Sequence, residues 1–292
     1  FRDLSYYRYF TEQGIKVISL FTLDDFPQTG GVAEYMRVNA PRPPAAPREY
    51  FKTEWKFESS NPSYFHILPK SAPALDDERV YFGADNGTLW ALNQSDGSVA
   101  WSHKTLFGAG KKRIFSSPVV YDGIVYFGAY DGNLYALDAK TGKNIWVYRE
   151  ADWIGSSPCI APDLNTVFIG LEFGLWHTQG GIAALDLKTG EKKWSQPVET
   201  MVHSSPAYSE KQRLVAVGSS SGTVCAFDAK TGKVQWEFAA GGAVRAGFAF
   251  DEERGLICFG SEDKHIYVLS AKTGAVVHKI ETLEPIYSTP VV

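Results

Sequence analysis

The stretch that decides the fold is ALDAKTGKNIW, which runs from Ala136 to Trp146. It recurs as ALDLKTGEKKW from Ala184 to Trp194 and as AFDAKTGKVQW from Ala226 to Trp236. Two more divergent copies flank these three, ALNQSDGSVAW from Ala91 to Trp101 and VLSAKTGAVVH from Val268 to His278. A repeat of this kind constrains the architecture first, because every copy must fold into the same unit. Constant positions report the scaffold, and varying positions report what is particular to this chain.

One full repeat predicts four short strands rather than helices, since no stretch of it keeps a 3.6-residue hydrophobic period. In the second copy the β-rich runs cover 115–121, 124–129, 133–138 and 144–148. Tight turns supplied by polar–glycine pairs separate these runs, namely Asp122-Gly123, Asp131-Gly132 and Thr141-Gly142. Four strands joined by three tight turns form one antiparallel meander, which is one blade of a propeller.

The repeat period supports the same architecture. Each unit opens with a small–polar–proline element, at Ser71, Ser116, Ser156, Ser204 and Ser288, and the fifth unit replaces it with Ala246-Gly247-Phe248. These starts lie 40 to 48 residues apart, which is the blade range and too long for leucine-rich or ankyrin repeats. We therefore predict an all-β fold, a β-propeller of four-stranded antiparallel blades in residues 50–292, with five complete blades.

Parts of other blades are expected at both ends of this region. Glu54 to Phe57 resembles the end of a unit, as in Gln235 to Phe238. Tyr287 to Val292 reads as the opening strand of another unit. Five blades cannot close on these fragments, so we expect a native ring of seven or eight blades.

The first 49 residues do not fit the repeat. Residues 1–39 predict a short α/β segment, with a helix, a glycine cap and a strand. Residues 40–49, APRPPAAPRE, form a Pro-rich extended linker. The N-terminal segment is either the tail of an upstream domain or an arm that packs on the flank of the propeller.

The repeated pattern A-x-D-x-x-T-G-x-x-x-W resembles the tryptophan-docking motif of the PQQ-like, quinoprotein-type propeller family, over roughly residues 50–292. The resemblance implies that each motif tryptophan packs between neighbouring blades, while the Thr-Gly turn and the Asp hydrogen-bond around the ring. This structural docking role is expected for Trp101, Trp146, Trp194 and Trp236. His278 takes the place of the tryptophan in the fifth copy, so the fifth blade is expected to dock less firmly.

Catalytic chemistry is not apparent in the sequence. Enzymatic members of this family bind pyrroloquinoline quinone with calcium, and the resemblance to the alcohol dehydrogenases implies an adjacent Cys-Cys pair and a catalytic Asp. Here Cys159, Cys225 and Cys258 lie far apart, and the six histidines form no HxH or HExxH motif. No catalytic residue and no metal site is predicted, and the quinone with calcium is expected only if the chain is such a dehydrogenase.

A variable position in the repeat suggests a ligand site. Just before the small–polar–proline element, an apolar position is followed by one that differs in every blade. Because strand residues alternate between faces, we expect the varying side chains to point into the central funnel. Lys70, Phe115, His203, Arg245 and Tyr287 would then surround one axis and suit an anionic or aromatic ligand. The alternative is a solvent-filled channel whose lining residues vary without functional constraint.

The third blade carries a second departure, since 170–184 is six residues longer than the matched 128–136. The extra residues include Phe173, Trp176 and His177, which form a candidate partner-binding or ligand-covering loop. The alternative is a tolerated loop whose aromatic side chains cover the adjacent blade.

Composition narrows the function classes. The net charge of −4, without a Lys/Arg run, argues against a nucleic-acid surface, and no apolar stretch approaches the roughly 18 residues of a transmembrane segment. We predict a non-catalytic scaffold for protein–protein interaction that binds a protein, a peptide or a small ligand. The alternatives are a propeller module of a multidomain enzyme with an upstream catalytic domain, and a PQQ-dependent dehydrogenase. Periplasmic and cytoplasmic locations both remain open.

Overall fold

A computed structural model describes residues 54–57, 71–106, 113–174 and 178–292. The chain divides into two compact units, residues 1–59 and residues 60–292. The predicted helix–strand segment at 1–39 and the Pro-rich linker at 40–49 lie outside the described residues. Within the first unit, Glu54 to Phe57 contains no strand.

The second unit contains five four-stranded antiparallel sheets, which confirms the five predicted blades. The first blade comprises β1 (Ala74–Leu75), β2 (Arg79–Gly83), β3 (Thr88–Asn93) and β4 (Val99–Lys104). The second comprises β5 (Val119–Tyr121), β6 (Ile124–Gly128), β7 (Leu134–Asp138) and β8 (Asn144–Tyr148). The third comprises β9 (Cys159–Ala161), β10 (Thr166–Phe173), β11 (Gln179–Asp186) and β12 (Lys192–Val198).

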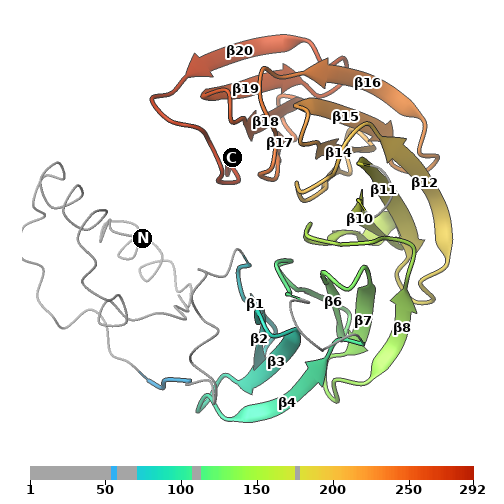
Figure 1. The fold of residues 1–292 in the computed structure, drawn as a ribbon, viewed down its shortest axis with the longest axis vertical. Coiled ribbons are helices and arrows are strands. Elements are labelled where there is room, and N and C mark those ends of the chain that lie inside the picture. Colours follow the sequence, from blue (N-terminus) through green and yellow to red (C-terminus); the bar gives the residue numbers. More distant parts are fainter. Residues whose placement is uncertain (1–53, 58–70, 107–112, 175–177) are drawn as a thin grey trace, which may run out of the picture. The chain divides into compact units, whose positions relative to one another are not determined.

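The fourth and fifth blades repeat this order. The fourth comprises β13 (Ala207–Ser209), β14 (Leu214–Gly218), β15 (Thr223–Asp228) and β16 (Val234–Ala239). The fifth comprises β17 (Ala249–Asp251), β18 (Leu256–Gly260), β19 (His265–Ser270) and β20 (Val276–Glu281). The first strands of successive blades contact one another, and Figure 1 shows them innermost, with the fourth strands outermost.

The hydrophobic core lies between blades rather than within them, as four clusters that each join two neighbouring sheets. A glycine at each joint allows the two neighbouring sheets to approach closely. In each blade a glycine of the second strand faces the apolar residue that precedes the next small–polar–proline element, as Gly128 faces Ile154 and Gly218 faces Val244. A Cβ at Gly128 would lie 2.2 Å from Cγ2 of Ile154. The constant apolar position of the repeat therefore packs between blades, and the glycine allows the sheets to approach.

The serines of the repeat add hydrogen bonds around the inner strands. In three blades the first serine hydroxyl accepts from the strand glycine, as Ser204 Oγ does from the Gly218 N–H at 2.7 Å. The second serine hydroxyl accepts a backbone N–H from the preceding blade, as Ser157 Oγ does from Ser117 at 2.9 Å. The fifth blade has Ala246 and Gly247 at these positions, so it offers neither hydroxyl.

Each blade contains a β-bulge at the same point, one residue after the position that pairs with the motif tryptophan. Ala136, for example, is opposite Trp146 in the ladder, and the register shifts between Ala136 and Leu137. A bulge increases the local twist of a strand pair. The alanine opposite leaves space beside the indole, which explains the constant Ala of the repeat.

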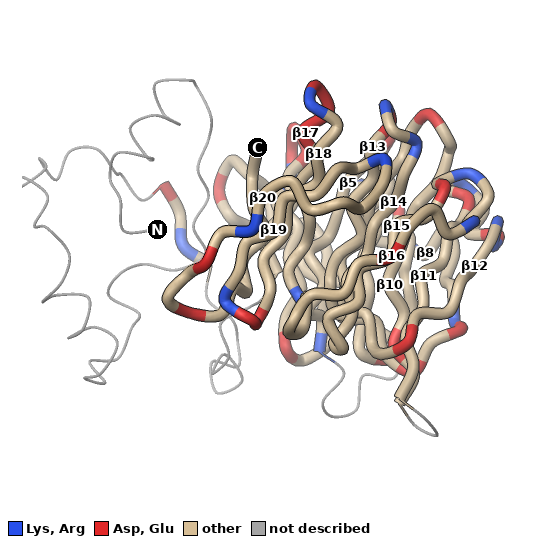
Figure 2. The backbone as a smooth tube through the Cα atoms, turned by 90° about the horizontal axis from the view of Figure 1, so that it is seen from above, with Lys and Arg blue, Asp and Glu red and all other residues tan. Residues whose placement is uncertain are grey.

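Two further features bear on the sequence predictions. Tyr287 to Val292 forms no strand, although Thr289 Oγ1 accepts the Gly247 N–H at 2.9 Å, in the manner of the second serines. Charged residues gather in the turns at the two ends of the sheets, while the strands are mostly uncharged (Figure 2). None of the helices within the described ranges has the length and apolar character needed to cross a bilayer.

Candidate functional site

The variable position of the repeat lies at the start of each blade, just before the innermost strand. Phe115, His203 and Arg245 are all described there, while Lys70 lies outside the described residues. Tyr287 is 66% exposed. In the third blade the same position is Gly155, which carries no side chain.

A second variable position faces the first. It lies two residues after the strand glycine and is occupied by Asp85, Tyr130, Glu172, Ser220 and Glu262; in the third blade it lies within the longer β10, and in the other blades it lies in the turn after the second strand. Backbone hydrogen bonds join it to the segment that enters the same blade. Tyr130 N–H donates to the Arg113 carbonyl at 3.0 Å, and Glu262 N–H donates to the Ala243 carbonyl at 2.9 Å. We call the two sets of positions together the inner rim.

Glu172 is the most buried charged residue of the inner rim, with 1% of its surface exposed. One carboxylate oxygen accepts the Gly155 N–H at 2.9 Å, and the other lies 3.2 Å from Nδ1 of His203 in the next blade. A buried carboxylate is costly unless partners of this kind satisfy it. The pair Glu172–His203 therefore joins the third and fourth blades.

Tyr130 and Phe115 form an aromatic wall beside this carboxylate. Their ring centroids are 4.6 Å apart in an edge-on arrangement. Burial, together with the charge of Glu172, raises the pKa of Tyr130 to about 12. A Cβ at Gly155 would lie 2.9 Å from the Tyr130 ring and 2.7 Å from Glu172, so the missing side chain at Gly155 makes space for both.

Arg245 brings a positive charge to the same region from the fifth blade. Its Nε donates to Glu262 at 2.7 Å, and its side chain remains 42% exposed. The guanidinium lies close enough to Tyr130, three blades away, to work against the rise in the tyrosine pKa. Side chains from the second, third, fourth and fifth blades thus converge.

Asp85 of the first blade and Arg113, in the segment that enters the second blade, form a further charged pair. The Arg113 guanidinium lies 5.9 Å from the centroid of the Phe115 ring. Burial raises the pKa of Asp85, and the charge of Arg113 partly opposes that effect. The inner rim therefore alternates acidic, aromatic and basic groups, which suits a ligand with both polar and apolar parts.

The lengthened hairpin of the third blade begins next to this rim. Phe173, at the end of β10, packs against the core between the second and third blades. Trp176 and His177 lie outside the described residues. Gly174 stands against Trp153 and Met201, and its N–H donates to the Asp152 carboxylate at 2.9 Å. The base of the hairpin is thus fixed beside Glu172.

The four motif tryptophans contact the following blade. Their indole N–H groups donate to backbone carbonyls there, Trp101 to Ala139, Trp146 to Leu187, Trp194 to Ala229 and Trp236 to Ala271, at 2.7 to 3.1 Å. Each ring lies against the glycine of the next Thr-Gly turn, at Gly142, Gly190, Gly232 and Gly274. These contacts lie in the joints between blades, away from the inner rim.

Metal ligands are not assembled in the part of the chain that the structure describes. No three His, Cys, Asp or Glu side chains there gather closely enough to hold a metal ion. Glu172, the buried carboxylate of the rim, is matched with a histidine and a backbone amide instead of further carboxylates. The described residues therefore do not fit the calcium that the dehydrogenase alternative requires.

The repeat and its docking contacts have counterparts in known proteins. A family model described as outer membrane protein assembly factor BamB, of the PQQ-like repeat type, matches residues 52–215 and 178–292. The chain belongs to this family. A comparison with curated proteins found no match.

Solved structures similar to this PQQ-like propeller fall into two groups. BamB from Moraxella catarrhalis has a TM-score of 0.60 and 19% identity, over 77% of this chain and 64% of that one. The quinohemoprotein alcohol dehydrogenase from Comamonas testosteroni has a TM-score of 0.60 and 19% identity, over 72% of this chain and 42% of that one. At this identity the likeness shows the shared fold, and the chain spans less than two thirds of either relative.

Sequence reasoning found the first variable position of this PQQ-like propeller but missed the second. Glu172 is the functional candidate that was overlooked. The signal was present in the aligned repeats, because the position two residues after the strand glycine changes from Asp85 to Tyr130, Glu172, Ser220 and Glu262. The position of Glu172 within a largely apolar strand is a second signal of the same kind.

Proposed function

We propose that this chain is a non-catalytic binding scaffold that holds a segment of a partner protein across the inner rim. The observation that carries the proposal is the convergence of Phe115, Tyr130, Glu172, His203 and Arg245 from four blades. A family whose described member is an assembly factor supports a protein partner.

The chemistry of the rim favours a peptide over a compact small ligand. Aromatic and arginine side chains dominate the binding energy of many protein interfaces, and here Phe115, Tyr130 and Arg245 are of these types. Glu172 orients the His203 ring, whose side chain is 23% exposed and can contact an amide or charged group. A peptide segment carries amide, apolar and charged groups along its length, so it can meet all three surfaces at once.

A peptide selection tests this proposal. A displayed library of random peptides would be selected on the 292-residue chain and counter-selected on a double variant, Arg245→Ala with His203→Gln. Glutamine at 203 retains a donor toward Glu172, so the variant does not leave a buried carboxylate unpaired. Selected peptides are expected to bind the double variant at least tenfold more weakly, a loss of about 1.4 kcal/mol or more.

A matched control is available on the opposite end of the sheets. Lys272→Ser removes a cation from the exposed turn between the third and fourth strands of the fifth blade, at the end of the sheet opposite the turn that holds Glu262, so it should leave peptide affinity unchanged. Equal affinity of the selected peptides for the wild type and for the double variant would contradict the proposal. A melting curve of each variant separates lost binding from lost folding.

Dehydrogenase relatives motivate a second candidate. The structural neighbours include alcohol dehydrogenases and a europium-containing methanol dehydrogenase, the last with 14% identity. Titration of the chain with pyrroloquinoline quinone and calcium, followed by the absorbance of the bound quinone, tests this alternative. Stoichiometric binding that Glu172→Gln abolishes would favour the dehydrogenase and count against the scaffold.

A further inference from the structure

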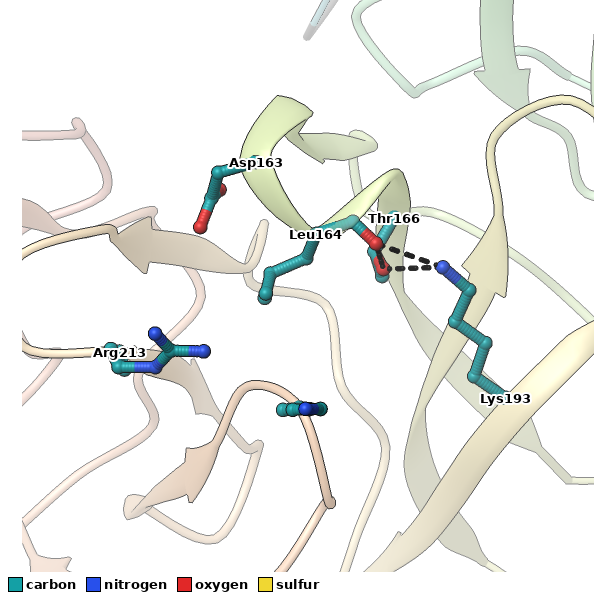
Figure 3. Close-up of a pocket in the computed structure, with 6 residues that line it drawn as sticks. Asp163, Leu164, Thr166, Lys193 and Arg213 are labelled. Atoms are coloured by element: carbon teal, nitrogen blue, oxygen red, sulfur yellow. Dashed lines mark hydrogen bonds between the residues drawn. The ribbon is translucent and has the colours of Figure 1, made fainter.

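A hollow on the other end of the sheets carries positive charge that the inner rim does not explain. It has a volume of about 440 Å³ and lies at the joint between the third and fourth blades. Six residues line it, Asp163, Leu164, Thr166, Lys193, Arg213 and Lys230. Figure 3 shows Arg213 and Lys193 approaching Leu164 from opposite sides of this pocket.

Comparison of the repeats shows that this concentration of charge is particular to one joint. The position before the motif tryptophan is Lys193 here and Ala100, Ile145, Gln235 or Val277 in the other copies. The turn position held by Arg213 is Glu78, Gly123, Asn165 or Gly255 elsewhere. Lys230 recurs as Lys140, Lys188 and Lys272. Among the described blades, three cations meet only at the joint between the third and fourth, whereas the equivalent positions of the other joints supply one.

Arg213 occupies a backbone conformation that an arginine rarely adopts. Its φ is +55°, in the left-handed region, which the two glycines and the asparagine at sister positions share and Glu78 of the first blade does not. The positions are structurally equivalent, because in each blade the carbonyl accepts the same turn hydrogen bond, as Arg213 does from Ala229 at 2.9 Å and Gly123 does from Ala139 at 2.9 Å. Glycine and asparagine tolerate this conformation best. A long cationic side chain held there at a conformational cost points to a function.

The remaining groups define the kind of ligand. Lys193 donates to the carbonyls of Leu164 and Asn165 and to Thr166 Oγ1, at 2.7 to 3.0 Å. Its Nζ also lies 3.4 Å from the Asp186 carboxylate, so its charge is largely matched within the protein. Arg213 and Lys230 are exposed and can donate to a bound group directly. Asp163, which accepts the Tyr208 hydroxyl at 2.8 Å, would repel a second anionic group but accept from a hydroxyl.

We infer that this pocket binds a small phosphate monoester that also carries a hydroxyl group. A phosphate carries nearly two negative charges, which match the two exposed cations, Arg213 and Lys230, better than a single carboxylate does. The guanidinium of Arg213 presents its donors in the planar geometry that pairs with two phosphate oxygens, while Lys230 supplies a point charge. The volume is that of a pocket for a small molecule. This site is independent of the inner rim and of the proposed scaffold function.

Titration with inorganic phosphate and with glycerol phosphate, at constant ionic strength in chloride, tests the site on the 292-residue chain. Calorimetry should show saturable binding that Arg213→Gly and Lys230→Ser each weaken at least tenfold. Both substitutions introduce residues that sister blades hold at the same position, Gly123 and Ser95, so the fold should accept them. Lys140→Ser, at the equivalent position of another joint, should leave the affinity unchanged.

Three results would overturn the inference. The wild type could show no saturable phosphate binding, or both pocket variants could bind phosphate as tightly as the wild type. Succinate, tested in parallel, could bind more tightly than either phosphate compound, which would assign the pocket to carboxylates. Tighter binding of glycerol phosphate than of inorganic phosphate supports the predicted hydroxyl contact with Asp163.

Discussion

The indole of Trp146 lies against Gly190 of the next blade, so closely that a Cβ at Gly190 would stand 2.6 Å from Cδ2 of the ring. The indole N–H donates to the Leu187 carbonyl at 2.9 Å, three residues before that glycine. Gly190 also has a φ of +72°. The turn and the docking contact therefore depend on the same residue, which explains why the Thr-Gly pair and the tryptophan recur together.

Gly190→Ala should destabilise the chain strongly, because the new methyl group meets both a left-handed backbone and the indole. Gly123→Ala is the matched control, since Gly123 has a φ of +73° but a Cβ there would have no heavy atom within 4 Å. We expect backbone strain to lower the free energy of unfolding of the control by roughly 1–2 kcal/mol. Overpacking should lower that of Gly190→Ala by about 1–3 kcal/mol more. Urea denaturation measures both, and equal losses would show that the docking contact tolerates the methyl.

Ala246→Ser should stabilise the fifth blade. Ser204 Oγ, at the matching position of the fourth blade, accepts from the Gly218 N–H at 2.7 Å and donates to its carbonyl at 2.9 Å. A serine at 246 should reach Gly260 in the same way and contribute about 0.5–1.5 kcal/mol. Ser204→Ala, the reverse change, should cost about 1–3 kcal/mol because it leaves buried backbone groups unpaired. Thermal melting of both variants checks the pair, and a destabilising Ala246→Ser would contradict it.

Stability should fall at alkaline pH, because burial raises the pKa of Tyr130 to about 12. An acid whose pKa is higher in the folded state stabilises the fold below its unfolded pKa of about 10. That contribution is lost as the pH rises from about 10 to about 12. Glu172→Gln should lower the pKa of Tyr130, and Arg245→Ala should raise it, as measured by NMR of labelled tyrosine. No change in either variant would contradict the convergence of these residues at the inner rim.

The dependence of stability on pH in acid should reveal the hydrogen bonds of the Asp–Thr turns. The Thr231 hydroxyl donates to Asp228 at 2.7 Å, and this hydrogen bond is the main cause of the lowered pKa of Asp228. A depressed carboxyl pKa stabilises the fold above the unfolded value of about 3.9 and loses this effect as the pH falls below it. Thr231→Val should therefore reduce stability at neutral pH more than in acid below that value, as measured by urea denaturation.

Thr273→Val is the control for that experiment. The fifth copy has Ser270 where the others have the turn aspartate, so Thr273 has no carboxylate partner at this position of the motif. Its substitution should cost the same at both pH values. If Thr273→Val lost stability with the same pH dependence as Thr231→Val, the turn aspartate would not be the source of that pH dependence.

The sequence-based prediction of the fold succeeded where neighbouring residues decide the structure. The β-branched and aromatic run 124–128 and the Asp122-Gly123 turn specify a hairpin from within a few residues, and every repeat supplied another copy of that information. The prediction failed at Tyr287 to Val292, which forms no strand. A strand needs hydrogen bonds from a neighbouring strand, and the residue pattern of one segment does not supply them.

The candidate sites depended much more on the tertiary structure. Phe115, His203 and Arg245 were identified as a varying series, but their partners were not. The contact between His203 and Glu172 joins residues of different blades, and its distance depends on how two sheets pack against each other. Sequence alignment of repeats shows which positions vary, whereas the angle between sheets decides which of them meet.

The sequence by itself determined the blade, its four strands, its turns and the repetition of the unit, because these follow from local hydrogen bonding and from a side-chain period of two. Only the tertiary structure decided that Glu172 is buried between Gly155 and His203, and that Lys193, Arg213 and Lys230 share one hollow. Those arrangements join separate blades across the packed cores between them. The physical reason is that the packing of large side chains against glycines sets how closely two sheets approach, and no single repeat contains that information.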